Sequence, residues 1–309
     1  MLDFFHYLYA EVIGIDNPLL FGIRYKSIFR ELLRVSANFL VPAYYRFSPT
    51  PSLPKQKREQ QVILSLTSFP GRINRVWIVI ESLLRQQIKA DRIVLWLSKD
   101  QFEGIDLPKS LIKLQKKGLE IRFVEGDIRS HKKYYYTLLE YPNDLLVTVD
   151  DDLYYSSSFL RNLMEAHVKQ PNAVISVYSF LIRYDERGNV MPYEQWIQPI
   201  KEGCYPSGVI FLGSGGGTLF PPQALYPDVL NIDLARELCP LADDVWLNAM
   251  CQMSQVNIVK VRGNNILLSI YNHSFNKTET LSSINNGKKL NDIQIKNVME
   301  HYPVFRKLF

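Results

Sequence analysis

The sequence Leu-Leu-Val-Thr-Val-Asp-Asp-Asp, residues 145–152, joins a short apolar run directly to three carboxylates. A run of this length, rich in Leu and Val, predicts a strand that is buried on both faces of a parallel sheet. Such sheets bind ligands beyond the carboxyl ends of their strands. We therefore expect Asp150, Asp151 and Asp152 to lie at a ligand-binding edge. The alternative interpretation is a solvated acidic turn.

The rest of the chain alternates between two patterns. Short apolar runs that predict strands occur at 62–66, 93–97, 121–124, 145–149, 174–177, 256–261 and 266–270. Helical spacing of apolar residues occurs at 73–88, 111–118, 132–141, 156–170 and 243–253. This alternation predicts an α/β fold with a mostly parallel central sheet flanked by helices. Thr67, Ser68 and Ser98 then share one edge of the sheet with Asp150.

The first 60 residues differ in character from the remainder. They are aromatic and basic, apolar residues approach helical spacing from Ile28, and Pro49, Pro51 and Pro54 predict a boundary. We predict an N-terminal helical extension over 1–60, a main domain over 61–275 and a C-terminal tail over 276–309. The extension either lies on a membrane surface or packs on the main domain or on a second subunit of a homo-oligomer.

Composition excludes several classes of protein. Of the 309 residues, 47% are hydrophobic and 22% charged, which is typical of a globular protein, and a net charge of +5 is too small to argue for nucleic-acid binding. Three cysteines without a CxxC pair predict reduced thiols. No basic leader and no run of 18 apolar residues is visible. We expect a cytoplasmic protein, either free or at the inner face of the plasma membrane.

Adjacent carboxylates repel one another, and a divalent cation relieves that repulsion. Mg²⁺ and Mn²⁺ take oxygen ligands, commonly one or two carboxylates together with substrate phosphates. Alternate residues of an extended segment point the same way. The triplet therefore predicts that Asp150 and Asp152 face a metal and donor site, with Asp151 in a supporting position.

Further candidates follow later in the chain. The run Gly213-Ser-Gly-Gly-Gly217 either lets the backbone approach a ligand closely or is a flexible loop. Asp243 and Asp244 open a predicted helix, where capping explains one carboxylate and general-base catalysis would explain the other. His273 follows the last apolar run and is either a structural histidine or a ligand.

In this order, the four features resemble the motifs of GT-A glycosyltransferases. That fold carries a DxD motif at a strand end, a glycine-rich loop, an xED motif opening a helix and a C-terminal histidine. The resemblance spans residues 61–275. The strings TSFPGRI at 67–73, KKYYYTL at 132–138 and DDVWLNAM at 243–250 look like those of bacterial enzymes that build capsule, lipopolysaccharide or other surface glycans. One departure is Asp243, which stands where the motif has glutamate.

The resemblance implies an activity and a set of roles. The enzyme would transfer a sugar, with inversion, from a nucleotide-diphosphate donor such as a UDP-sugar to a hydroxyl of a glycan or lipid-linked acceptor. Residues 61–152 would bind the donor and 153–275 the acceptor. Asp244, or else Asp243, would be the base. Mn²⁺ or Mg²⁺ would be held by Asp150, Asp152 and His273. The donor would contact Thr67, Ser68, Arg72, Ser98, Lys133, Asp150, Asp151, Gly215 and Gly216.

Two other functions fit part of the pattern. A sugar nucleotidyltransferase would also use a sheet, carboxylates and a metal, but would usually place a glycine-rich basic loop after its first strand. Here that loop, 67–72, contains one glycine. A non-catalytic glycan-binding subunit of a polysaccharide assembly complex would suit the 18 Tyr and 16 Phe residues. Aromatic side chains mostly fill cores, however, and a binder needs no second acidic pair.

Overall fold

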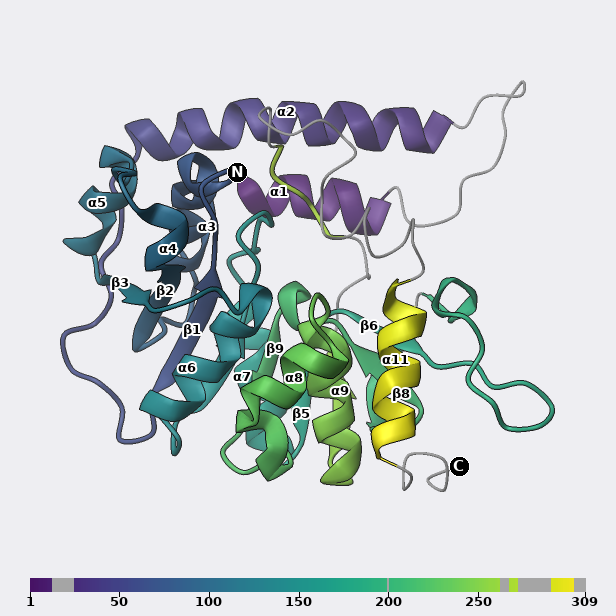
Figure 1. Cartoon of the computed structure of the whole chain (residues 1–309). Helices are drawn as coiled ribbons and strands as arrows, with labels where there is room; N and C mark the ends of the chain where they lie inside the picture. Colours follow the sequence, from purple (N-terminus) through teal and green to yellow (C-terminus); the bar gives the residue numbers. More distant parts are fainter. Residues whose placement is uncertain (13–24, 199, 262–266, 272–289, 303–309) are drawn as a thin grey trace.

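The computed structural model describes residues 1–12, 25–198, 200–261, 267–271 and 290–302 (Figure 1). Its centre is an eight-stranded sheet with the order β3-β2-β1-β4-β9-β5-β10-β7, and β6 (Ser179–Leu181) pairs separately with β8 (Ile210–Leu212). The strands of the large sheet are β1 (Val62–Thr67), β2 (Arg92–Ser98), β3 (Leu119–Val124), β4 (Leu145–Thr148), β5 (Val174–Ser176), β7 (Gly203–Pro206), β9 (Thr218–Phe220) and β10 (Asn257–Lys260).

The direction of the strands confirms the prediction of a mostly parallel sheet. Only β9 and β7 run antiparallel to their neighbours in this sheet. Because β9 opposes β4, Thr218 at its start is paired with Thr148 at the end of β4. The glycine-rich run that precedes β9 is thereby brought to the acidic triplet that follows β4.

Helices cover both faces of the sheet. One buried cluster holds α2 (Tyr25–Phe47), α3 (Ile73–Leu84), α5 (Lys109–Gln115) and α7 (Phe159–Lys169), and short α1 (Leu2–His6) joins it. The opposite side carries α6 (Lys132–Glu140), α8 (Ile232–Leu238), α9 (Asp243–Met253) and α11 (Leu290–His301). The four-residue α4 (Lys99–Phe102) follows β2. Both layers are visible in Figure 1.

Strand β1 shows why the central runs are mostly apolar. Leu64 and Leu66 belong to the cluster that contains α3, whereas Ile63 packs with Val94 and Trp96 on the other face. Alternate residues of a strand point to opposite faces, so a sheet covered on both sides favours apolar residues on both. The buried exception in β1 is Ser65, whose hydroxyl donates to the Lys133 carbonyl.

The run 266–270 differs from its prediction. Among the described residues 267–271, Ser269 forms an isolated bridge with Leu153 and no strand of the large sheet is present. The Tyr154 amide donates to the Leu268 carbonyl at 2.9 Å, and the Ile270 amide donates to the Asp152 carbonyl at 2.7 Å. Both edges of β10 are already paired, with β5 and β7, so this segment pairs with the acidic segment instead.

The helix predicted from Ile28 is present as α2, which ends at Phe47, just before Pro49. Pro42 lies inside it, where the missing amide removes one helical hydrogen bond. Within the described ranges, no helix combines the length and the apolar character needed to cross a membrane.

Asp91 fixes the start of β1. Its buried carboxylate accepts hydrogen bonds from the Val62 amide at 2.8 Å and from the Arg58 amide at 3.0 Å. Burial acts to raise the pKa of Asp91, but these amides and the Arg58 guanidinium more than offset it, so the pKa lies below its ordinary value.

We expect Asp91→Asn to lower the free energy of unfolding by about 1–3 kcal/mol at pH 7, because asparagine has a single accepting oxygen and would turn an NH2 donor toward one of the two backbone amides. A carboxyl with a lowered folded-state pKa stabilises above its unfolded pKa and loses that contribution as the pH falls through the folded value. The difference from wild type should therefore shrink below about pH 4. Urea unfolding at pH 7 and pH 3 measures this, with exposed Asp106→Asn as the control.

Candidate functional site

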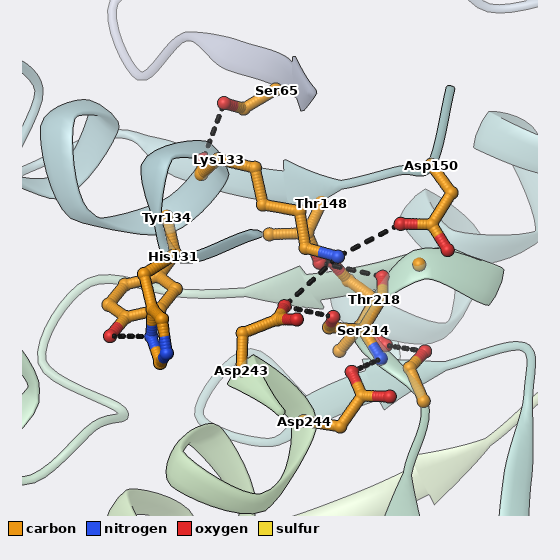
Figure 2. Close-up of polar contacts among 12 residues, drawn as sticks. Ser65, His131, Lys133, Tyr134, Thr148, Asp150, Ser214, Thr218, Asp243 and Asp244 are labelled. Atoms are coloured by element: carbon orange, nitrogen blue, oxygen red, sulfur yellow. Dashed lines mark hydrogen bonds and ion pairs between the residues drawn. The ribbon is translucent and has the colours of Figure 1, made fainter. Parts of the chain in front are cut away.

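Lys133, in the first turn of α6, is the junction of the site. Its Nζ lies 2.9 Å from Asp150 Oδ1 and 3.0 Å from Asp243 Oδ2, as Figure 2 shows. The side chain is buried, which acts to lower its pKa, but the two carboxylates raise the pKa above its ordinary value. Lys133 is therefore a cation that joins the end of β4 to the start of α9.

Ser214 locks the glycine-rich loop to the same helix start. Its hydroxyl donates to Asp243 Oδ2 at 2.7 Å, and its backbone amide donates to Asp244 Oδ1 at 2.7 Å (Figure 2). Ser214 thus donates a hydrogen bond to both Asp243 and Asp244. The loop and the first turn of α9 form a single unit.

The two acids differ in ionisation. Burial opposes ionisation of Asp243, yet Lys133 and the Ser214 hydroxyl hold its pKa down at about 2. Burial, followed by the charge of Asp243, raises the pKa of Asp244 to about 7. Asp244 Oδ2 receives no hydrogen bond from the described part of the chain. Asp243 is paired with Lys133, whereas Asp244 keeps an oxygen available and holds its proton to a higher pH than an ordinary aspartate does.

Gly215 lies directly against Asp150. The Asp150 amide donates to the Gly215 carbonyl at 3.2 Å and to the Tyr155 hydroxyl at 2.7 Å, and that hydroxyl donates to the Gly215 carbonyl at 2.6 Å. A Cβ on Gly215 would lie 1.7 Å from Asp150 Oδ2, and one on Gly216 would lie 2.3 Å from the Cβ of Tyr178. This close packing requires glycine at both positions.

Arg72 binds the rest of the acidic triplet. One of its terminal nitrogens lies 2.8 Å from both Asp151 Oδ1 and Asp152 Oδ2, and the Ser68 hydroxyl donates to Asp151 Oδ2 at 2.5 Å. Burial raises the pKa of Asp152 to about 7 against the pull of Arg72. The protein contacts thus divide the triplet, because Asp150 contacts Lys133 while Asp152 shares Arg72 with buried Asp151.

The other predicted residues lie at the expected edge with different partners. The Thr67 hydroxyl donates to the Trp96 carbonyl at 2.8 Å, and the buried Ser98 hydroxyl accepts from the Gln101 amide at the start of α4. Both hydroxyls are therefore engaged with backbone. His273 lies outside the described residues.

Two contacts were not anticipated from the sequence. Ser214 interrupts the glycine run, and that interruption is the signal that could have identified it. Tyr155 had no signal, because its role depends on a carbonyl 60 positions later in the chain.

The carboxylates of the site outnumber its cations, since Arg72 and Lys133 face the triplet and the helix-opening pair. Asp150 Oδ2 and Asp152 Oδ1 receive no hydrogen bond from the described residues. No group of three or more His, Cys, Asp and Glu residues within those ranges is arranged to hold a metal. The residues fit a divalent cation that takes two carboxylates and completes its shell with phosphate oxygens and water.

No protein-family model matches the chain, and no curated protein matches it. The chain resembles 4-diphosphocytidyl-2C-methyl-D-erythritol synthase from Anaerococcus prevotii at 18% identity and a TM-score of 0.42, covering 75% of this chain and 99% of that chain. It resembles GalNAc-T7, solved with UDP, GalNAc and Mn²⁺, at 11% identity and a TM-score of 0.46, covering 93% and 66%.

A third similar structure is the mannosyltransferase PcManGT from Pyrobaculum calidifontis in complex with GDP-Man and Mn²⁺. Its identity is 14% and its TM-score 0.32, covering 50% of this chain and 47% of that chain. At these identities and TM-scores, the likenesses say nothing about the roles of the site residues.

We expect Lys133→Met to lower the free energy of unfolding by about 3–5 kcal/mol, because it leaves two carboxylates without their buried counter-ion. Adding Asp243→Asn to Lys133→Met should recover part of that loss, giving a coupling energy that a double-mutant cycle in urea measures. Exposed Lys113→Met is the control. Equal stability of wild type and Lys133→Met would show that the ion pairs are not structural.

Proposed function

We propose that this protein is a metal-dependent glycosyltransferase of the GT-A type, acting on a nucleotide-diphosphate sugar. One observation carries the proposal. Lys133 and Ser214 bring the carboxylates after β4 and the acidic pair of α9 into one site, where Asp243 is ionised and Asp244 has a pKa near 7. An ion-binding acid cluster beside a tuned base is what sugar transfer to a hydroxyl requires.

The donor would bind at the edge formed by Asp150, Asp152 and the glycine-rich loop. Asp150 and Asp152 would hold Mn²⁺ or Mg²⁺, which when bound stabilises negative charge on the departing diphosphate. Arg72 lies beside both Asp151 and Asp152, so it would orient the metal-binding carboxylate of Asp152 and supply further positive charge. Gly215 leaves room for the Asp150 carboxylate, because a side chain at position 215 would overlap it.

Asp244 would act as the general base. Its uncommitted Oδ2 takes the proton of the acceptor hydroxyl while that oxygen bonds to the anomeric carbon. The bond from that carbon to the phosphate oxygen breaks on the opposite face, and its electron pair leaves with the nucleoside diphosphate. A single displacement of this kind inverts the anomeric configuration. Lys133 keeps Asp243 ionised, and that charge in turn raises the pKa of Asp244.

The finer features of the proposal come from the motif resemblance. They are a UDP-sugar donor, a glycan or lipid-linked acceptor, a role in bacterial surface polysaccharide synthesis, donor binding by 61–152 and acceptor binding by 153–275. A nucleotidyltransferase and a glycan-binding subunit are the alternatives that the assays below separate.

We expect one nucleotide sugar of a panel to raise the melting temperature in the presence of Mn²⁺ and to yield free nucleoside diphosphate. Ligand at a hundred times its Kd adds about 2.7 kcal/mol to stability by mass action. Asp152→Asn should weaken the metal-dependent shift, while exposed Asp106→Asn should leave it unchanged. Pyrophosphate release from a sugar 1-phosphate and a nucleoside triphosphate would instead identify a nucleotidyltransferase. Binding without turnover of any acceptor would favour a glycan-binding subunit.

We expect Asp244→Asn to lower kcat by about 10²- to 10⁴-fold, the usual contribution of general-base catalysis, with little change in donor binding. The amide oxygen of asparagine can still accept from the Ser214 amide, so the loop should stay in place. Steady-state kinetics and donor titration separate the two effects. Unchanged turnover of the true donor would remove Asp244 from the mechanism.

The pH dependence follows from the raised pKa of Asp244. A base must be ionised, so kcat/KM should rise with pH and level off above about 7. Stability should change in the opposite direction. The folded state keeps a proton that the unfolded chain releases near its ordinary pKa of 3.8, so this contribution is full below that value and is lost as the pH rises to about 7. Asp244→Asn should flatten both profiles.

A further inference from the structure

The solvent side of α2 is apolar along most of its length. Phe39 is 75% exposed and Phe47 is 89% exposed. The exposed large apolar residues from the start to the end of this helix are Ile28, Phe29, Leu32, Val35, Phe39, Leu40, Tyr44 and Phe47. Most of them recur at intervals of three and four residues, so they form one stripe on the helix.

The opposite side of α2 is also apolar. Ala37, Val41 and Tyr45 are buried in the cluster that contains α3 and the sheet. A helix that is apolar on both sides is normally covered on both sides. Figure 1 shows α2 as a long helix along the outside of the molecule. An exposed apolar surface of this extent marks an interaction site.

The charges of α2 indicate what covers it. The helix carries Lys26, Arg30, Arg34 and Arg46 against a single acid, Glu31. Arg34 is paired with Glu31, and the other three cations have no acidic partner in the described part of the chain. Basic residues beside an exposed apolar and aromatic stripe match the surface of an anionic bilayer. Pairing with a second α2 would bring like charges together, which is unfavourable.

We propose that α2 lies in the plane of an anionic membrane surface, with its outer stripe inserted among the lipids. The helix is then a peripheral anchor, which agrees with the absence of a spanning helix in the described ranges. This proposal concerns lipid binding alone and holds whatever reaction the site performs.

The inner side of α2 connects this surface to the candidate site. The Asn38 amide group donates to the Ser269 carbonyl at 2.9 Å, and its oxygen accepts from the Tyr271 amide at 2.7 Å. The same segment pairs with Asp152 through the Ile270 amide. Only the segment 269–271 therefore separates the backbone of Asp152 from the inner side of α2. The proposed lipid surface would lie on the outer side of α2, one helix diameter, roughly 10 Å, from its inner side. On the proposed function, this proximity favours a lipid-linked acceptor.

Flotation of the purified full chain with vesicles tests the proposal. We expect binding to vesicles that contain phosphatidylglycerol, weaker binding at high salt, and little binding to vesicles of phosphatidylcholine alone. Phe39→Glu and Leu32→Glu should each weaken binding about tenfold or more, because each replaces an inserted apolar side chain with a charge. Val168→Glu on α7 is the matched control, since Val168 is 77% exposed and far from α2 in sequence.

Two outcomes would overturn the proposal. One is wild-type affinity for anionic vesicles in both Phe39→Glu and Leu32→Glu, with circular dichroism showing them folded. The other is that light scattering shows a dimer for wild type and a monomer for both variants, while wild type does not bind to the vesicles. Turnover of a water-soluble acceptor without vesicles should be the same in Phe39→Glu and wild type, so failure of the enzymatic assignment is measured separately.

Discussion

The ion pairs of one buried ammonium group hold the site together. Lys133 joins Asp150, just after β4, to Asp243, at the start of α9, two residues that are far apart in the chain. Without that cation, the carboxylates after β4 and those that open α9 would repel each other. The site thus contains more carboxylates than cationic side chains, and a bound divalent cation would offset the excess negative charge.

Strand topology makes this arrangement possible. The antiparallel course of β9 between β4 and β5 returns the glycine-rich loop to the edge where the acidic triplet emerges. Ser214 then ties the loop to α9, and Tyr155 ties it to the Asp150 backbone. Segments distant in sequence converge because the carboxyl ends of the parallel strands share one edge.

The sequence predicted the parallel part of the fold, and the position of the acidic triplet at the end of β4, for local reasons. Strands such as β1 are apolar on both faces, and the triplet directly follows one of them. Three features depended on long-range pairing that no local pattern encodes. These are the direction of β9, the pairing of 267–271 with the acidic segment, and the division of the triplet between Lys133 and Arg72.

The acidic pair shows the same limit of local patterns. Either Asp243 or Asp244 was an acceptable base from sequence, because both open the same helix. Their contacts in the fold differ: Lys133 of α6 pairs with Asp243, whereas among the described residues the Asp244 carboxylate accepts only from the Ser214 amide. Thr67 and Ser98 were placed at the correct edge, but their hydroxyls are engaged by backbone groups whose positions only the folded chain defines.

The packing of Gly215 on Asp150 has a consequence for how related chains would vary. Since a single carbon at position 215 would overlap the carboxylate of residue 150, position 215 cannot enlarge while residue 150 keeps its carboxylate there. A larger residue at 215 becomes tolerable only when residue 150 is shortened. Any side chain at position 215 should therefore be accompanied by loss of the carboxylate at position 150, whereas the carboxylate at 150 can be lost while 215 stays glycine.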